Sequence, residues 1–153
     1  ELFSQIVDHV ATTGGRRRIA LQVDGTDEES LAAPLAASCG EIVVVPVYRW
    51  ALPHDTRPAE ALVGLVCDGG VDAVTFTTRQ AAVHLVDVAE AQGRRRDLVD
   101  ALDGTRVVPV SVGPVCSEAM RALGMTGVVE PDRARLVAML DALAEVARTR
   151  SGS

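Results

Sequence analysis

The sequence contains no lysine and no asparagine, and all 15 of its basic residues are arginine. Without lysine the chain cannot form a Schiff base, build the phosphate loop of P-loop NTPases, or work as a typical phospho-receiver domain. Arginine remains well suited to carboxylate ligands, because its guanidinium keeps its charge and donates through a planar fork. The arginine triplets at 16–18 and 94–96 are expected at solvated helix ends or strand starts. Arg49 and Arg79 instead follow the carboxyl ends of expected strands, so they are the arginines best placed for function.

Other specialised residue types are also scarce. Only 3% of the residues are aromatic, so the core must consist of alanine, valine and leucine. The three cysteines form no Cys-x-x-Cys pair and are expected to be buried in a reducing cytoplasm. The histidines are isolated, so we expect no metal site. We also expect no organic cofactor. Apolar stretches are short, which argues against a membrane span, and the net charge of −6 argues against nucleic acid as a partner of this segment.

The pattern of apolar residues predicts an α/β fold. Short apolar runs, typical of buried strands, alternate with segments of helical spacing. The expected strands are 19–23, 42–47, 71–76, 107–112 and 127–129, and the expected helices are 2–10, 30–38, 58–67, 80–92, 97–102, 115–123 and 132–148. Right-handed crossovers would join five such strands into a flavodoxin-like, doubly wound parallel sheet with the order 2-1-3-4-5. At 153 residues, the chain suits one compact domain or two very small ones.

Ligands of such sheets bind beyond the carboxyl ends of the strands, which selects four turns as candidate sites. These turns hold Gly25 and Thr26; Tyr48 and Arg49; Thr77, Thr78 and Arg79; and Gly113, Pro114, Val115 and Cys116. The turns lack the glycine pattern of a dinucleotide site, the serine elbow of a hydrolase and the aspartate of a receiver domain. Ser111 lies inside a strand pattern and is expected to be a hydrogen-bonded core hydroxyl.

Several of these segments match one family. They are Val-Asp-Ala-Val-Thr-Phe-Thr-Thr at 71–78, Val-Gly-Pro-Val-Cys-Ser-Glu-Ala at 112–119, Gly-Val-Val-Glu-Pro at 127–131, and Ile-Val-Val-Val-Pro-Val-Tyr-Arg at 42–49. In this order, and before a leucine-rich final helix, they resemble the C-terminal half of uroporphyrinogen-III synthase. The resemblance extends from about residue 18 to residue 147. It consists of several weak motifs in the right order.

The resemblance implies a divided fold, since these enzymes have two similar α/β domains joined by two linkers. Residues 1–47 would be the last helix and last two strands of domain two, and 48–58 the linker. Residues 59–150 would be the C-terminal part of domain one, and 151–153 a tail. Because Glu1 starts in mid-pattern, we expect a fragment. Either the linker folds back to complete one five-stranded domain, or two chains exchange halves in a dimer.

The resemblance also implies a reaction: closure of hydroxymethylbilane, a linear tetrapyrrole with many carboxylates, to uroporphyrinogen III with inversion of the last pyrrole ring. Thr77, Thr78 and Arg79 would bind substrate carboxylates, together with the turns at Gly25, Thr26 and Arg49 and the turn from Gly113 to Cys116. Tyr48 would assist loss of the hydroxyl group. A helix cap for the threonines and simple linker packing for Tyr48 are the structural alternatives.

Departures from the family leave the function open. Cys116 stands where the family usually has threonine, and Asp24 stands beside Gly25 where an arginine is usual. The fragment alone is expected to be inactive, because half of any cleft would be missing. One alternative is a ligand-sensing or degenerate synthase-like domain of a winged-helix transcriptional regulator. Another is an α/β domain with an unrelated small ligand.

Overall fold

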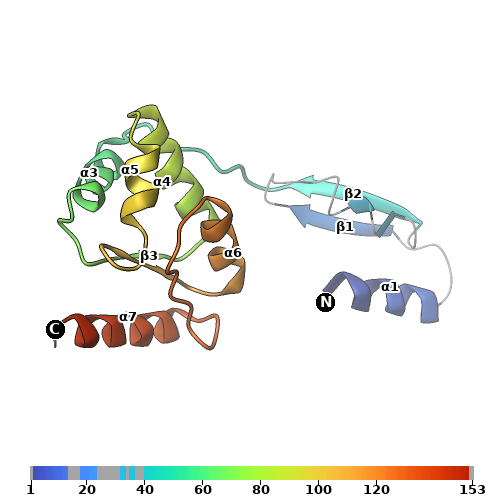
Figure 1. Cartoon of the computed structure of the whole chain (residues 1–153). Coiled ribbons are helices and arrows are strands. Elements are labelled where there is room, and N and C mark those ends of the chain that lie inside the picture. The colour runs from blue at the N-terminus through green and yellow to red at the C-terminus, as the bar shows by residue number, and fades with distance from the viewer. Residues whose placement is uncertain (1, 14–17, 24–31, 34, 37–39, 152–153) are drawn as a thin grey trace. The chain divides into compact units, whose positions relative to one another are not determined.

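The computed structural model describes residues 2–13, 18–23, 32–33, 35–36 and 40–151. The chain divides into two compact units, Glu1–Ala51 and Leu52–Ser153 (Figure 1). The boundary between the units falls inside the segment 48–58. The assignment of these parts to the two domains of a synthase stays a prediction.

The first unit contains helix α1 (Leu2–Thr13) and the strands β1 (Arg18–Val23) and β2 (Glu41–Pro46). The two strands pair in parallel, from Arg18 opposite Glu41 to Val23 opposite Pro46. The pairing continues for one further bond, in which the amide of Val47 donates to the carbonyl of Val23 across 3.3 Å. These strands agree with the apolar runs of the sequence, whereas most of the expected helix 30–38 lies outside the described residues.

The second unit alternates helices with two parallel strands. Its elements are α3 (Arg57–Cys67), β3 (Ala73–Phe76), α4 (Arg79–Ala91), α5 (Arg95–Ala101), β4 (Val108–Ser111), α6 (Pro114–Ala122) and α7 (Leu136–Ser151). The strands β3 and β4 pair from Ala73 opposite Val108 to Phe76 opposite Ser111. The helices α4 and α5 make the crossover connection that two parallel strands need.

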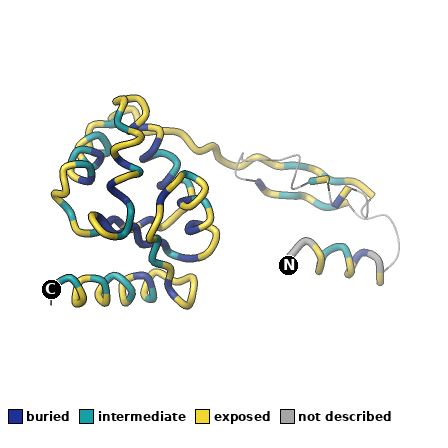
Figure 2. Tube along the Cα trace, in the orientation of Figure 1, coloured by how far each residue is buried: buried dark blue, intermediate teal, exposed yellow. Residues whose placement is uncertain are grey.

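Helices cover both faces of this sheet. Val74 and Phe76 of β3 pack into the main core with buried residues of α3, α4, α5 and α6. Val108 and Val110 of β4 project to the other face, where they contact Met139 of α7. The buried segments in Figure 2 follow this layering, with the interior between the strands and the helices α3 to α6. The alternation along each strand therefore serves two separate cores.

Two expectations for the end of the chain are wrong in detail. The expected strand 127–129 is reduced to one parallel bridge between Val129 and Val110. The carbonyl of Pro109 accepts from the amide of Val129, but proline has no N–H to give to the carbonyl of residue 127, so the ladder cannot extend backwards. The final helix begins at Leu136 rather than at 132, because residues 132–135 form bends.

The described residues thus confirm an α/β fold with parallel strands, but they form two sheets of two strands each. A single five-stranded sheet and an exchange of halves between chains remain predictions. Among the described helices, none has the length and apolar character needed to cross a membrane.

Candidate functional site

The turn after β3 presents hydroxyl groups at the start of α4. Thr77, Thr78 and Arg79 are all exposed. Thr78 has extended backbone angles and caps the helix, since its Oγ1 accepts from the amide of Ala81 at 3.1 Å. This is the helix cap considered from the sequence. A hydroxyl that accepts in a cap still carries its own proton, so Thr78 is able to donate to a carboxylate at the same time.

The turn after β4 requires glycine because another segment crosses it closely. A Cβ on Gly113 would lie 2.6 Å from the Cβ of Ala134, far inside any allowed contact. The backbone of Gly113 is extended, so it is space rather than conformation that excludes a side chain. Residues 132–135 therefore lie directly against the start of α6, an arrangement that no sequence motif indicated.

Helix α6 has few backbone donors left for a ligand. The amides of Cys116 and Ser117 both donate to the carbonyl of Gly113, at 3.1 and 3.0 Å. Pro114 has no N–H, so within this first turn the amide of Val115 is the donor that these bonds leave available. Val115 itself is 68% exposed. The anion-binding capacity expected of the turn from Gly113 to Cys116 is thus concentrated at one residue.

Cys116 points into the core rather than toward a ligand. Its side chain is buried, with the Sγ atom 3.5 Å from the carbonyl oxygen of Phe76 and 3.7 Å from the sulfur of Met120. Burial raises the pKa of the Cys116 thiol above its usual range. The residue is therefore a packed hydrophobe, which agrees with the reading of the cysteines as buried apolar groups.

A buried pair of hydroxyls fixes α6 to the sheet. Ser111 at the end of β4 and Ser117 in α6 are both fully buried, and their Oγ atoms are 2.5 Å apart. Each hydroxyl satisfies the other, so neither leaves an unpaired polar atom in the core. Ser111 is accordingly a bonded core hydroxyl, as its place in the strand pattern predicted.

The sheet brings two of the four candidate turns together. The amide of Val112 donates to the carbonyl of Phe76 across 3.0 Å, so the turns at 77–79 and 113–116 begin side by side. Tyr48 and Arg49 belong to the first unit, where Tyr48 is 52% exposed and its ring meets that of Trp50 edge-on at 5.7 Å. Gly25 and Thr26 lie outside the described residues.

Two further arginines were missed from the sequence. Arg133 and Arg135 are exposed and flank Ala134, the residue that contacts Gly113. A turn in which the amide of Arg135 donates to the carbonyl of Arg133 at 2.7 Å holds them. Only the three-dimensional path of residues 132–135 places them near the turn after β4, so spacing alone gave no signal.

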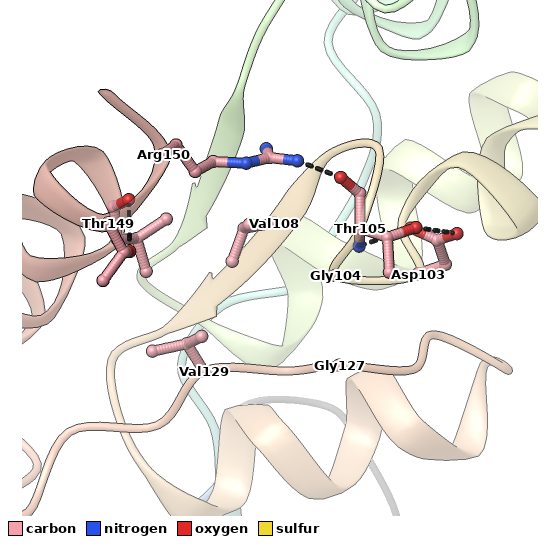
Figure 3. A pocket seen from close by; sticks show the side chains of 9 residues that line it. Asp103, Gly104, Thr105, Val108, Gly127, Val129, Thr149 and Arg150 are labelled. Atoms are coloured by element: carbon pink, nitrogen blue, oxygen red, sulfur yellow. Dashed lines mark hydrogen bonds between the residues drawn. The ribbon is translucent and has the colours of Figure 1, made fainter. Parts of the chain in front are cut away.

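The opposite, amino end of the sheet is closed by hydrogen bonds around a cavity of about 370 Å³ (Figure 3). Arg150 reaches from α7 to three carbonyl oxygens, those of Asp72 at 2.8 Å, Arg106 at 3.1 Å and Thr105. The carboxylate of Asp103 accepts from the amides of Arg106 and Thr105 at 2.8 and 2.7 Å and from the Thr105 hydroxyl at 2.7 Å. These bonds, that of the Arg106 amide foremost, lower the pKa of Asp103 to about 2.

Comparison with known proteins identifies the family. Residues 2–141 match the family described as "Uroporphyrinogen-III synthase HemD". The chain belongs to the uroporphyrinogen-III synthase family. This confirms the resemblance drawn from the strand-end motifs.

Relatives and solved structures agree with this assignment. The chain is 38% identical over 104 residues to "Putative uroporphyrinogen-III synthase" of Methanothermobacter thermautotrophicus, which covers 68% of this chain and 39% of that protein. It is 27% identical over 129 residues to "Uncharacterized protein YjjA" of Bacillus subtilis, covering 84% and 47%. Uroporphyrinogen III synthase of the extremely thermophilic bacterium Thermus thermophilus has a similar fold, with a TM-score of 0.60 and 25% identity over 95% of this chain and 56% of that one. The chain thus spans about half the length of these proteins.

Proposed function

We propose that this chain forms part of an enzyme that closes hydroxymethylbilane to uroporphyrinogen III and inverts the last pyrrole ring, a step of tetrapyrrole biosynthesis in the cytoplasm. The observation that carries the proposal is family membership over residues 2–141. The net reaction releases water: the terminal hydroxyl leaves with a proton, and a new carbon–carbon bond closes the ring. The substrate is the partner that we propose, with no cofactor and no nucleic acid bound through this segment.

Exposed hydroxyl and guanidinium groups support this substrate class. The substrate carries carboxylates, which hydroxyl donors, backbone amides and arginine bind well. Thr77, Thr78 and Arg79 supply such groups after β3, and Val115 supplies an amide after β4. Gly113 and Pro114 shape the second turn and give it no side-chain donor. Positioning of the substrate, rather than a charged catalytic group, is the contribution that this surface is suited to make.

Tyr48 is the candidate for assisting loss of the hydroxyl. Its ring rests edge-on against Trp50, and half of the residue is exposed, so its phenol is accessible to a substrate. A phenol is able to donate a proton toward a departing hydroxyl. Arg49 and the turn at Gly25 and Thr26 complete the proposed binding residues. Catalysis then needs the two units brought together, which is why we propose that the chain alone is inactive.

Completion of the sheet is part of the same proposal. In the part of the chain that the structure describes, each unit has a sheet of two paired strands, which is marginal by itself. We propose that the five-stranded, flavodoxin-like sheet forms by exchange of halves between two copies of the chain. Two linkers and two complete sheets would result.

A second candidate function rests on Cys116. Because its sulfur is buried against Phe76 and Met120, it cannot replace a hydroxyl donor for a substrate. A synthase-like domain that senses a ligand in a winged-helix regulator needs no such donor. The gene sequence beyond Ser153 separates the two functions, since a basic helix-turn-helix there would favour the regulator.

Cyclisation of hydroxymethylbilane by the gene's full-length product is the deciding experiment. The products are oxidised to porphyrins and separated by isomer, with the 153-residue chain run in parallel. We expect the type III isomer with the full-length product and the type I isomer of spontaneous closure with the chain alone. Only type I isomer from the full-length product would exclude the enzyme, and type III from the chain alone would show that the fragment is active.

A further inference from the structure

Arg133 and Arg135 are exposed, and among the described residues their side chains make no hydrogen bond and no ion pair. Most other arginines of the second unit use their guanidinium groups within it. Carboxylates bind those of Arg57, Arg94, Arg95, Arg96, Arg121 and Arg148, and backbone carbonyls bind those of Arg106 and Arg150. Arg133 and Arg135 thus keep their donors available for a ligand.

Both arginines lie beside the first turn of α6. A Cβ on Gly113 would lie 3.1 Å from the Cα of Ala134, so residues 133–135 pass directly over the turn after β4. Because consecutive Cα atoms are 3.8 Å apart, the Cα atoms of Arg133 and Arg135 lie within about 9 Å of that of Gly113. Arginine side chains are long enough to reach the space in front of the Val115 amide, the donor that the bonds of this turn leave available.

Arginine is a poor residue at this point for the stability of α7. The amide of Met139 donates to the carbonyl of Arg135 at 3.0 Å, so Arg135 stands at the cap position before the helix. That position favours serine, threonine, aspartate or asparagine, whose side chains accept from the first amides. The helix dipole also disfavours positive charge there, and the first turn of α7 contains no acidic residue. A surface residue that opposes its own helix is expected where the side chain serves a ligand.

The electrostatic field at this crossing is positive. Gly113 directly precedes α6 and Ala134 lies just before α7, so the two helices present the positive ends of their dipoles at the same place. Among residues 130–135, Glu130 is already in an ion pair at 3.5 Å, which leaves the carboxylate of Asp132 against two arginines. Glu118 lies one turn further along α6. The groups around the crossing therefore favour an anionic ligand.

We propose that Arg133 and Arg135 form a carboxylate-binding site with the amide of Val115, and that this site binds carboxylates of the linear tetrapyrrole. The inference rests on the proposed function and names binding residues for it. A guanidinium donates two parallel hydrogen bonds to one carboxylate, so two arginines suit a substrate that carries many. They supply donors that the turn itself lacks, because the thiol of Cys116 is buried and the amides of Cys116 and Ser117 are bonded to Gly113.

The first test removes the two charges from the full-length product of the gene. Arg133→Gln and Arg135→Gln keep a polar side chain, and each should raise the KM for hydroxymethylbilane about fivefold with kcat nearly unchanged. The double variant should raise KM by tenfold or more, about the product of the two single effects. Arg148→Gln is the matched control, since it removes the same charge from the last turn of α7, where Arg148 pairs with Glu145. A double variant with the KM of the wild type, or a control that raises KM equally, would overturn the proposal.

Asp132→Asn tests the sign of the charge effect. Removal of this carboxylate beside the two arginines should lower the KM about twofold, because it no longer repels the substrate. Added salt should raise the KM of the wild type more steeply than that of the double glutamine variant, since salt screens exposed charges. Equal salt dependence of the two proteins would show that Arg133 and Arg135 do not meet the substrate.

Arg135→Ser separates ligand binding from a structural role. Serine is a good cap for α7, and the substitution removes a positive charge from the start of that helix, so the urea midpoint should rise. The KM should rise as well, because a donor to the substrate is lost. A residue that served stability alone would change the midpoint and leave the KM of the wild type, and that result would overturn the proposal.

Uroporphyrin III, the oxidised cyclic product, tests the site without the reaction. In a fluorescence titration of the full-length product, the Kd should be about tenfold weaker for the double glutamine variant than for the wild type. Inorganic phosphate at the same concentration should not displace the porphyrin, and displacement would overturn the proposal by showing a general anion site. Arginine-dependent porphyrin binding by a protein that forms only type I isomer would refute the proposed activity and leave the site intact. Type III isomer made by the double variant at unchanged KM would refute the site and leave the activity intact.

Discussion

The two ends of the β3–β4 sheet use their polar groups in opposite ways. At the amino end, Arg150 and Asp103 make their hydrogen bonds within the unit itself, mostly to backbone groups. At the carboxyl end, Thr77, Thr78 and Arg79 are exposed, and the Thr78 cap uses only an acceptor site of its hydroxyl. The amino end is thus built to stabilise the unit, whereas the carboxyl end keeps donors at the surface.

This difference shows which of the two ends can hold a ligand-binding site. The cavity at the amino end is bordered by groups that already have partners, so its volume does not indicate a ligand. The carboxyl end is where parallel sheets bind ligands, because strand ends and helix starts converge there. Substitutions at the amino end should therefore change stability alone, whereas those at the carboxyl end should also change substrate binding.

The largest effect should come from Gly127→Ala at the amino end. Gly127 has φ of +61°, and a Cβ there would lie 2.5 Å from the carbonyl oxygen of Asp103, so the two loops would have to separate. Left-handed strain together with overpacking predicts a loss of about 3 kcal/mol in the free energy of unfolding, measured in urea. Gly93→Ala is the matched control. Its φ is +69° with nothing within 4 Å of the added atom, so we expect only about 1 kcal/mol. Equal losses would show that the loop contact carries no weight.

Replacement of Arg150 by methionine comes next. It removes donors from three carbonyl oxygens that belong to Asp72, Thr105 and Arg106, and hydrogen bonds from a charged donor contribute about 1.5–3 kcal/mol. We expect a loss of about 2 kcal/mol in unfolding free energy and faster amide exchange at the end of α7. Arg148→Met is the control, because the ion pair of Arg148 among the described residues is with exposed Glu145 on the same helix, a contact of at most about 1 kcal/mol. A control as damaging as the test variant would contradict the role given to the carbonyl contacts.

At the carboxyl end, Thr78→Val should act on both stability and substrate. Loss of the cap on α4 costs about 1 kcal/mol. Loss of a hydroxyl donor to a carboxylate raises the KM for hydroxymethylbilane about tenfold in the full-length product. Thr78→Ser should restore both, since it keeps the hydroxyl. A variant that loses stability with unchanged KM would show that Thr78 is only a cap.

The sequence predicted the parts of the fold that periodicity and strand-end turns encode. The apolar runs at β1, β2, β3 and β4 gave the parallel strands, and the turn motifs gave the family. Arg133 and Arg135 were missed because they lie near the site only where residues 132–135 pass over Gly113. No local sequence pattern indicates that contact. The hydrogen bond from Arg150 to the carbonyl of Asp72 joins residues 78 positions apart, so the sequence did not predict it either.

Cys116 shows that the sequence does not predict the direction of each side chain at the site. The sequence predicted that the backbone amide of Cys116 would face a ligand and that its thiol would be a small buried hydrophobe. Spacing alone places Cys116 in the first turn of α6, but the direction of its side chain depends on the packing of Phe76 and Met120. At the same turn, the amides of Cys116 and Ser117 donate to the carbonyl of Gly113, which no spacing in the sequence indicates.

The smallest expected effect concerns pH at the amino end. Because the pKa of Asp103 is lowered to about 2 in the folded chain and is near 3.9 when unfolded, the carboxylate stabilises the fold above pH 3.9. That contribution is lost as the pH falls toward 2. In urea titrations between pH 5 and pH 2, Asp103→Asn should therefore lose stability less steeply than the wild type. Asp100→Asn is the control, because it removes a carboxylate from an exposed ion pair with Arg96, where the two atoms are 3.5 Å apart. If both variants flatten the slope equally, the loop hydrogen bonds of Asp103 have no special part in acid stability.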